Sequence, residues 1–413
     1  MADTATKPNS KVNPVPDAAP LLQSLQLQNF LSFGPDAQTI TLGPLNILIG
    51  ANGSGKSNLI EAISLLRSCP VSASSRSSLE SSVRRGGGAD EWIWKGDPMS
   101  PAILNAVFKN LDAKEPLQHR IEFTSEQKRF QLSRENIGTA NAGPAPEKGQ
   151  HFYAYGQGNH VVQMGSDNGP RQINKQTIED NVSILAQRND PEQYPEISYL
   201  IRQYEKIAIY REWQFGRNTP LREAQSVLGR SDRLEEDFSN LYLYLNHLYS
   251  RPKTKRLLLE KLRDIYSEVT DISFELYSTS IRILLTEGDY SIPSERLSDG
   301  TLRYLCLLAI LCDPTPPPLI CIEEPELGLH PDILPKIADL LVAASKRTQL
   351  IVTTHSDVIV DAMTPTPEAV VVCEKHEGQT ELRRLSAENL KVWLDKYRLG
   401  ELWTMGELGG TRW

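Results

Sequence analysis

The sequence has few cysteines and no long apolar run, and each shortage excludes a class of protein. Its five cysteines include no Cys-x-x-Cys pair, and its seven histidines are scattered, so neither a disulfide-stapled secreted domain nor a zinc module is expected. The longest apolar run, Leu305 to Cys312, has eight residues and is too short to span a bilayer. We therefore expect a cytoplasmic protein with no membrane partner.

Positive charge and repetition are also scarce. The chain has 44 Lys and Arg against 52 Asp and Glu, a formal net charge of −8, which argues against coating nucleic acid through overall charge. No sustained heptad pattern occurs between Ser57 and Ser298, which excludes a long coiled-coil arm, and no repeat of fixed period is found. Residues 1–20 contain four prolines and no apolar signal-peptide core, so they are expected to be a disordered tail.

Hydrophobic patterning predicts a mixed α/β chain whose 413 residues are enough for two or three domains. Serine-rich Ser68–Ser82 and Gly/Ala/Pro-rich Gly138–Gly149 are expected to be irregular, the second as an exposed hairpin tip. Helices are expected from Asn58 to about Arg67, over Ile197–Tyr204, through much of Ser231–Val269, and near the C-terminus. Strands are expected over Leu25–Phe33 (at a sheet edge), Thr39–Leu42, Ala102–Phe108, His119–Phe123, Arg129–Leu132, His151–Gln163, Ile207–Tyr210, Ile272–Leu276, Ile281–Thr286 and Ala369–Cys373, with a hairpin through Glu381–Leu385.

The segment Gly50–Ser57 organises the rest of the chain. It reads G-x-x-x-x-G-K-S between the apolar run Leu45–Ile49 and the helical pattern that starts at Asn58, which is the arrangement of a phosphate-binding loop. Glycines let backbone N–H groups wrap a polyphosphate, and the following helix adds the positive end of its dipole. The competing interpretation, a glycine-rich turn with a surface lysine, does not explain why all fixed positions match. The residues expected to contact the nucleotide here are Gly50, Asn52, Gly53, Ser54, Gly55, Lys56, Ser57 and Asn58.

Two later apolar runs end in residues that suit a nucleotide site. Leu319–Ile322 is followed by Glu323 and Glu324, which could hold Mg²⁺ and deprotonate a water; alone it could also be a strand end with a solvated acidic turn. Leu350–Thr354 is followed by His355, which could contact a γ-phosphate or be purely structural.

A short polar motif precedes these two runs. Leu297–Thr301 reads L-S-D-G-T, where Ser298 could cap a helix and Gly300 could leave N–H groups open to an anion. In isolation it would be read as a simple helix cap. The order loop, L-S-D-G, EE strand, His strand makes the features jointly informative.

On these motifs, the chain resembles the ATPase heads of the ABC-type RecF/SMC-like group, and the stand-alone bacterial ATPases related to the OLD proteins. The resemblance is carried by NFLSF at Asn29–Phe33, GANGSGKS, LSDGT, ICIEEPELGLHP at Ile320–Pro331, and TTHS at Thr353–Ser356, and it extends to the C-terminal LGELWTMGELGGTRW. It implies a P-loop NTPase with a mixed, mainly parallel core sheet, an N-terminal antiparallel β subdomain and an inserted helical lobe. The implied division is a tail over 1–20, a nucleotide-binding lobe over 21–215 and 297–413, and the inserted lobe over 216–296.

The resemblance also implies roles for individual residues. Lys56 and Ser57 would bind phosphate and Mg²⁺, Glu323 would bind the metal, and Glu324 would be the catalytic base. Catalysis would further use Lys56 and His355, while Ser298 and Gly300 would touch the γ-phosphate held by a second copy. The glutamine that senses nucleotide is harder to place: Gln214, after a predicted strand, is preferred over Gln187. Glu323 stands where such heads usually have Asp, and Leu31 where they often have a basic residue.

The resemblance predicts an ATPase that uses ATP and Mg²⁺ and dimerises head-to-tail around ATP. Its process would be a DNA transaction such as repair, recombination or anti-phage defence. The alternative is a sensor ATPase that controls a protein partner, such as a separately encoded nuclease or toxin, because the residues after Ser356 leave no room for a nuclease domain. An ABC transporter subunit fits less well, since its signature reads L-S-G-G-Q and its helical lobe is shorter.

Overall fold

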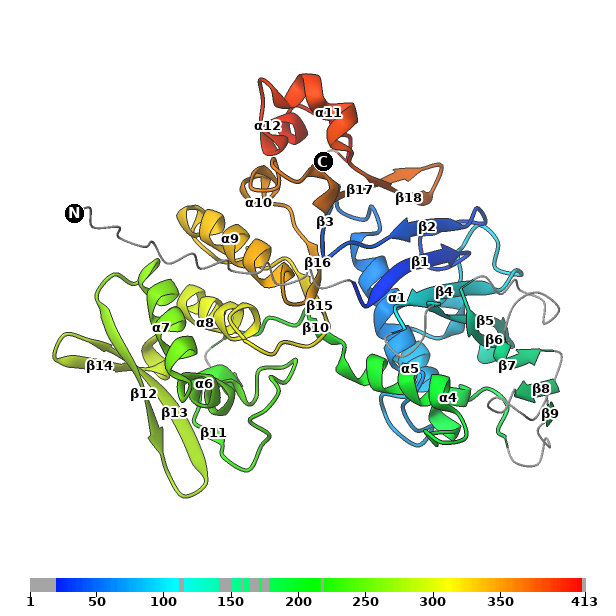
Figure 1. Ribbon diagram of the computed structural model, residues 1–413, viewed down its shortest axis with the longest axis horizontal. Coiled ribbons are helices and arrows are strands. Elements are labelled where there is room, and N and C mark those ends of the chain that lie inside the picture. Colours follow the sequence, from blue (N-terminus) through cyan, green and yellow to red (C-terminus); the bar gives the residue numbers. More distant parts are fainter. Residues whose placement is uncertain are drawn as a thin grey trace, which may run out of the picture.

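A computed structural model describes residues 20–110, 115–140, 151–156, 159–162, 171–172, 178–216 and 219–410. Figure 1 shows three sheets with helices between and around them. The central one is a six-stranded sheet in the order β10-β15-β16-β3-β17-β18, parallel except for β18. Its strands are β3 (Leu45–Ile49), β10 (Ala208–Tyr210), β15 (Leu319–Glu323), β16 (Gln349–Thr353), β17 (Val370–His376) and β18 (Gln379–Arg384).

The central sheet is buried on both faces, which explains why its strands are nearly continuous apolar runs. Ile47 and Ile49 of β3 face one hydrophobic core, and Leu48 between them faces the other. β15, β16 and β17 alternate in the same way. In Figure 1, α8 and α9 lie on one side of the sheet, and α1 with the large antiparallel sheet lies on the other.

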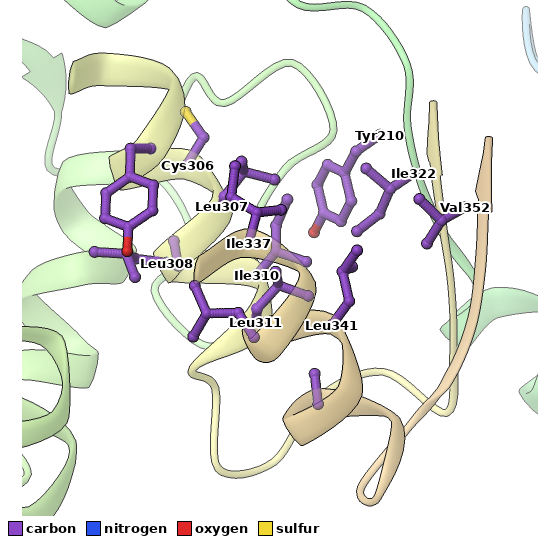
Figure 2. Packing of buried hydrophobic residues seen from close by; sticks show 14 of the residues in the cluster. Tyr210, Cys306, Leu307, Leu308, Ile310, Leu311, Ile322, Ile337, Leu341 and Val352 are labelled. Carbon is purple, nitrogen blue, oxygen red and sulfur yellow. The ribbon is translucent and has the colours of Figure 1, made fainter. Parts of the chain in front are cut away.

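The first core is packed mainly by α8 and α9. Figure 2 shows Leu307 and Ile310 of α8 and Ile337 of α9 pointing toward Ile322 and Val352 on the sheet. The helices of this side of the molecule are α6 (Leu241–Tyr249), α7 (Pro252–Arg263), α8 (Asp299–Leu311), α9 (Leu334–Ser345), α10 (Asp357–Asp361), α11 (Ala387–Leu394) and α12 (Leu399–Thr404).

The second core lies between the central sheet and an eight-stranded antiparallel sheet in the order β2-β1-β4-β5-β6-β7-β8-β9. Its strands are β1 (Leu22–Gln28), β2 (Gln38–Thr41), β4 (Ala102–Phe108), β5 (Leu117–Glu126), β6 (Arg129–Thr139), β7 (His151–Gly156), β8 (Asn159–Val162) and β9 (Arg171–Gln172). The helices near it are α1 (Lys56–Arg67), α2 (Leu79–Arg85), α3 (Ala89–Trp92), α4 (Ile184–Gln187) and α5 (Pro195–Lys206).

The inserted segment combines α6 and α7 with a third, four-stranded sheet in which β13 pairs with β11, β12 and β14. These strands are β11 (Gln225–Ser226), β12 (Val269–Leu276), β13 (Ser280–Glu287) and β14 (Tyr290–Pro293). No helix in the described part of the chain is both long enough and apolar enough to cross a membrane.

Most predicted elements are confirmed, but the first strand is shorter and more central than expected. β1 ends at Gln28 and lies between β2 and β4, so it is not an edge strand. The chain leaves the strand because Asn29 and Leu31 both have a left-handed φ of 51°, and Phe30 and Phe33 exchange two backbone hydrogen bonds in a tight turn.

The serine-rich segment expected to be irregular ends in helix. α2 starts at Leu79 because the side chain of Ser78 accepts the backbone N–H of Ser81 at 3.4 Å. α3 follows, and the indole of Trp92 donates to the carbonyl of Val83 at 3.0 Å, which ties the two helices together. Such short helices depend on tertiary contacts that local sequence does not reveal.

Other boundaries differ from the prediction as well. β6 continues to Thr139, so Gly138 is a paired, buried strand residue and not part of an exposed tip. Helix within Ser231–Val269 is confined to α6 and α7, and α7 opens on Pro252. The predicted C-terminal helix is two helices, α11 and α12. The strand predicted over His151–Gln163 is two strands, β7 and β8, and the predictions for 1–19, 141–150, 157–158 and Gln163 lie outside the described residues.

Candidate nucleotide-binding site

The loop Gly50–Ser57 leaves the carboxyl end of β3 and opens α1, as predicted. Gly53 and Gly55 adopt left-handed φ values of 75° and 97°, which residues with a Cβ rarely reach. A Cβ on Gly55 would also lie 2.2 Å from Oγ1 of Thr380 and 2.8 Å from Oγ of Ser32. The left-handed backbone of the turn therefore favours glycine at both positions, and the close packing behind the loop requires it at Gly55.

The loop carries exposed polar groups and one buried cation. Asn52, Gly53 and Ser57 are exposed, and the first N–H groups of α1 have no intrahelical partner. Lys56 is buried, and its ammonium donates to the carbonyls of Gly50 at 2.7 Å and Ala51 at 2.9 Å. Burial lowers the pKa of this lysine, because desolvation disfavours its charge.

The hydrogen-bond partners of these loop groups show whether the loop suits a polyphosphate. The buried Oγ of Ser54 lacks a hydrogen-bond partner among the described residues, and Lys56 is hydrogen-bonded to carbonyls, with no carboxylate bonded to it in the same part of the chain. An anion held by the loop would satisfy the helix N–H groups and neutralise a buried cation. The residues present therefore fit a nucleotide phosphate.

Parallel pairing brings the end of β15, with its two glutamates, and the end of β16, which leads to His355, beside the phosphate loop. β16 lies between β15 and β3, with Thr353 opposite Glu323 on one side and Leu48 on the other. Glu324 Oε1 and His355 Nε2 are 3.5 Å apart, each about one-third exposed. Glu324 has a left-handed φ of 44°, and its N–H donates to the carbonyl of Thr353 at 3.0 Å. The structure thus brings together the carboxylate and imidazole that sequence reasoning singled out.

The carboxyl group of Glu323 is in an unusual environment. Desolvation is the main cause that raises its pKa to about 7; Arg211 opposes the rise, whereas Glu61 and Glu324 add to it. Arg211 is held in turn by Glu61 of α1, at 2.6 Å between Nη1 and Oε1. The described residues contain no group of three His, Cys, Asp or Glu side chains that could hold a metal alone. A Mg²⁺ ion here would need phosphate and water oxygens besides Ser57 and Glu323, as is usual for this ion.

Glu326 is a site residue to which the motif ICIEEPELGLHP alone gave no role. Its Oε1 accepts the hydroxyl of Thr354 at 2.7 Å and the backbone N–H of His355 at 2.6 Å. Burial raises the pKa of Glu326, and its other oxygen has no hydrogen-bond partner in the described part of the chain. It therefore fixes the backbone of the histidine strand end relative to the acidic loop. Its place three residues after Glu323 in E-E-P-E was the available signal.

The L-S-D-G motif is an exposed helix start. Ser298 caps α8 and accepts the N–H of Thr301 at 3.1 Å, as predicted, and both Ser298 and Asp299 are exposed. A Cβ on Gly300 would sit 3.4 Å from the carbonyl of Gly328, so the motif packs on the loop that follows the acidic strand. In the described part of the chain, Ser298 is not hydrogen-bonded to Gly50–Ser57.

The two candidate glutamines lie in different places. Gln214 is exposed and follows β10, which is parallel to the acidic strand β15. Gln187 ends α4, where its side chain bonds backbone groups of Glu179 and Val182. Gln214 is thus at the same sheet edge as Glu323, whereas Gln187 closes a local loop.

Arg303 was missed because its partners are distant in sequence. It is buried in α8 and donates to the carbonyl of Leu327 and, at 3.5 Å, to that of Glu324. Its guanidinium lies 4.8 Å from the ring centroid of Trp213 and 5.1 Å from that of Phe215. One cation therefore joins the helix of the L-S-D-G motif, the loop after Glu324 and the segment that carries Gln214.

The back of the phosphate loop is supported by residues from both ends of the chain. Oγ of Ser32 accepts from Asn58 and from Thr380, each at 2.6 Å, so Asn58 braces the loop from behind. The backbone of Gly410 approaches Gly50 closely: a Cβ on Gly410 would lie 3.2 Å from the Cα of Gly50. The C-terminal segment is thus part of the wall behind the loop.

This arrangement defines the class of the protein. A phosphate loop, two carboxylates at the end of the next-but-one strand, and a histidine between them can bind a nucleotide and activate a water. The α/β fold with its parallel core sheet is that of a P-loop NTPase, with the ABC-type arrangement seen in SMC-like heads.

The comparisons with known proteins place the chain in a family. Residues 45–361 match the family described as "AAA domain, putative AbiEii toxin, Type IV TA system", and the chain belongs to it. No curated protein matches. Among solved structures, an Smc head bound to the C-winged helix domain of ScpA is 17% identical, with a TM-score of 0.53 over 90% of this chain and 99% of that one. An Smc head with an extended coiled coil, bound to the C-terminal domain of ScpA from Pyrococcus furiosus, is 16% identical, with a TM-score of 0.52 over 91% and 99%.

We predict that Mg²⁺ binding depends on pH through Glu323. Below its raised pKa of about 7 the carboxyl group is protonated and cannot bind a cation, and above it the carboxylate is available. The affinity for Mg²⁺ in the presence of a non-hydrolysable ATP analogue should rise about tenfold from pH 6 to pH 8. Calorimetric titration at pH 6, 7 and 8 measures it. Glu323→Gln should lose this pH dependence, whereas any pH dependence caused by titration of the nucleotide would remain. Equal pH profiles for the wild type and Glu323→Gln would contradict the role given to Glu323.

We also predict that Arg303→Ala lowers kcat for ATP hydrolysis about tenfold, because the loop that carries Glu324 loses its anchor. KM for ATP should change little, since Arg303 does not touch the phosphate loop. Arg303→Lys keeps the charge but not the planar fork of the guanidinium group, so its kcat should lie between those of the wild type and Arg303→Ala. Steady-state kinetics with a thermal unfolding control test this, and an unchanged kcat in a folded Arg303→Ala protein would be the contrary result.

Proposed function

We propose that this protein binds ATP with Mg²⁺ and hydrolyses it. The observation that carries the proposal is the 3.5 Å approach of Glu324 and His355 at the sheet edge beside the phosphate loop. A carboxylate poised next to an imidazole can accept a proton from a water, and the histidine can hold that water or a phosphate oxygen in place. The loop supplies Lys56 and the N–H groups of α1 for the phosphates.

Different residues of the chain would bind the metal, activate the water and stabilise the phosphates. Ser57 and Glu323 would hold Mg²⁺, which when bound neutralises phosphate charge. Glu324 would orient and deprotonate the attacking water, and Lys56 would stabilise negative charge on the phosphates. Gln214 at the same edge would report the state of the site to the segment held by Arg303.

We further propose that two copies meet head-to-tail around ATP. Ser298 is exposed and Gly300 is half-buried at the start of α8, where free N–H groups can donate to a phosphate oxygen held by a second copy. The contact with Gly328 sets this motif beside the loop after Glu324, so dimer contact and hydrolysis would be mechanically linked. ATP stabilises such a dimer only as far as it binds the dimer more tightly than the monomer.

Glu324→Gln should therefore accumulate as an ATP-bound dimer. The amide keeps the side chain's shape but cannot accept the proton, so ATP persists at the interface. Light scattering with Mg·ATP should report twice the monomer mass of 46.2 kDa, and the monomer mass with ADP. A variant that stays monomeric at micromolar concentration would sink the dimer proposal.

Two variants in the Glu324→Gln background serve as controls for the dimer. Lys56→Ala should abolish ATP binding and dimerisation together, since the loop loses its cation. Ser298→Asp keeps the helix cap but places a negative charge where the γ-phosphate of the partner would lie, so ATP should bind without dimerisation. Retained ATP affinity in Lys56→Ala would contradict the assignment of the loop.

The process we propose is a DNA transaction such as repair, recombination or anti-phage defence, with a local basic surface on α7. Of the basic group around it, Lys255 pairs with Asp271 at 3.3 Å and Arg251 contacts His247, whereas Lys253 and Arg256 are exposed. Two exposed charges at one helix start can contact phosphates. This is a modest surface, which suits weak, salt-sensitive binding.

A second candidate is a sensor ATPase that controls a protein partner without binding DNA. The matched family is described as a putative AbiEii toxin of a type IV toxin–antitoxin system, and the similar Smc head is bound to ScpA. The Smc head's bound ScpA favours a partner that is a protein, and the family description favours a toxin–antitoxin setting, in which the partner would be a nuclease or toxin encoded separately. In this case the ATP-bound dimer would be the form that the partner recognises.

One binding experiment separates the two candidates. If DNA is bound, Lys253→Ala/Arg256→Ala should weaken the affinity and reduce the slope of log K against log salt by about 2, one unit for each phosphate contact. Lys128→Ala/Arg129→Ala removes the same charge from the exposed β5–β6 hairpin and is the matched control. No DNA affinity in the wild type, together with a protein captured by Glu324→Gln only with ATP, would decide for the sensor.

A further inference from the structure

A polar cavity lies at the other end of the helix that begins in the phosphate loop. It measures about 440 Å³, within the usual range for small-molecule sites. Its walls come from the last turn of α1, the serine-rich segment after it, α2, and the junction of α5 with β10. Ser64 and Arg67 of α1 line this cavity, about 12–17 Å along the helix from Lys56, so it is a separate site.

The side chains that line this cavity are mostly cationic or hydroxylic. Arg67, Arg85 and Arg233 supply guanidinium groups, and Ser77 and Ser82 are among the serines that supply hydroxyls. Glu205, which is exposed, is the acidic member of the lining. In a chain with net charge −8, three arginines around one cavity are a local reversal of sign.

Two of these arginines are fixed on one backbone carbonyl. Arg67 donates to the carbonyl of Ile207 at 3.3 Å and is paired with Glu236, and Arg233 donates to the same carbonyl at 2.8 Å. Arg85 donates to Oγ of Ser82 at 3.3 Å. Arg67 thus has a carboxylate partner, while the contacts seen for Arg85 and Arg233 are with neutral oxygens. The guanidinium groups are held in place without full neutralisation of their charge.

We propose that this cavity binds the phosphate group of a phosphate monoester. Guanidinium forks match phosphate oxygens in geometry and charge, and serine hydroxyls add neutral donors around them. A carboxylate ligand would use fewer of these donors, and an uncharged ligand would leave the arginines uncompensated. Two sources carry this chemistry, a free mononucleotide and the 5′-phosphate of a nucleic acid end.

Calorimetric titration with inorganic phosphate and with AMP tests the proposal on four full-length proteins: wild type, Lys56→Ala, Arg85→Glu and Arg84→Glu. Arg84 is the matched control, because it is exposed on the same helix as Arg85 but does not line the cavity. Binding that persists in Lys56→Ala and Arg84→Glu and weakens at least about tenfold in Arg85→Glu supports the site. Binding lost in Lys56→Ala, or weakened equally by both arginine changes, overturns it.

The source of the phosphate is resolved with two pairs of probes in the Lys56→Ala protein. AMP is compared with adenosine, and a short 5′-phosphorylated DNA duplex with the same duplex carrying 5′-hydroxyls. A preference for the phosphorylated member in either pair, sensitive to Arg85→Glu, supports the proposal and identifies the source. Equal binding within both pairs overturns it. ATP hydrolysis should be unchanged in Arg85→Glu, so failure here is distinguishable from failure of the proposed ATPase.

Discussion

The register of the parallel strands is the constraint on which the site depends. Because β16 pairs with β15 on one side and β3 on the other, the carboxyl ends of three strands meet at one edge. Glu324 and Gly50 are the first residues beyond their strands and His355 is the second, so backbone pairing brings all three to one edge of the sheet. A slip of one residue would turn buried side chains to the opposite face and separate the carboxylate from the imidazole. Function and fold are therefore specified by the same hydrogen bonds.

Burial on both faces makes that register hard to change. Ile47 and Leu48 point into different cores, one packed by α8 and α9 and the other by α1 and the antiparallel sheet. Truncating either residue would leave a cavity in one core only, at a cost of about 2–5 kcal/mol for loss of a large aliphatic side chain. Each core also carries part of the site: α1 holds Lys56, and α8 holds Arg303. The sheet thus couples two packed layers that approach the nucleotide site from opposite sides.

The sequence allowed the loop and the strand ends to be predicted because their chemistry demands fixed residue types at fixed spacing, and those spacings are local. Gly50–Ser57 and Ile320–Glu324 are examples, and Ser298 as a helix cap is another. Arg303 was out of reach because its aromatic partners lie about ninety positions away and carry no motif of their own. α2 was missed for a related reason, since a seven-residue helix is stabilised by packing and by its cap, not by propensity. The long-range contacts around the motif residues could not be predicted, because local sequence does not encode them.

The charges around Lys56 explain why binding of phosphate and binding of Mg²⁺ at this site would depend on each other. Burial lowers the pKa of the lysine, and the nearby charges of Glu324 and Glu326 oppose that shift without a direct hydrogen bond to the ammonium. An anion bound by the loop would add negative charge next to these carboxylates, which favours a cation between them and the phosphates. Binding of phosphate and of Mg²⁺ should therefore be mutually reinforcing, by the reciprocity that holds for any pair of linked ligands. The pKa of Glu323, which desolvation raises, belongs to the same balance, since a bound cation would favour the ionised form of that carboxyl group.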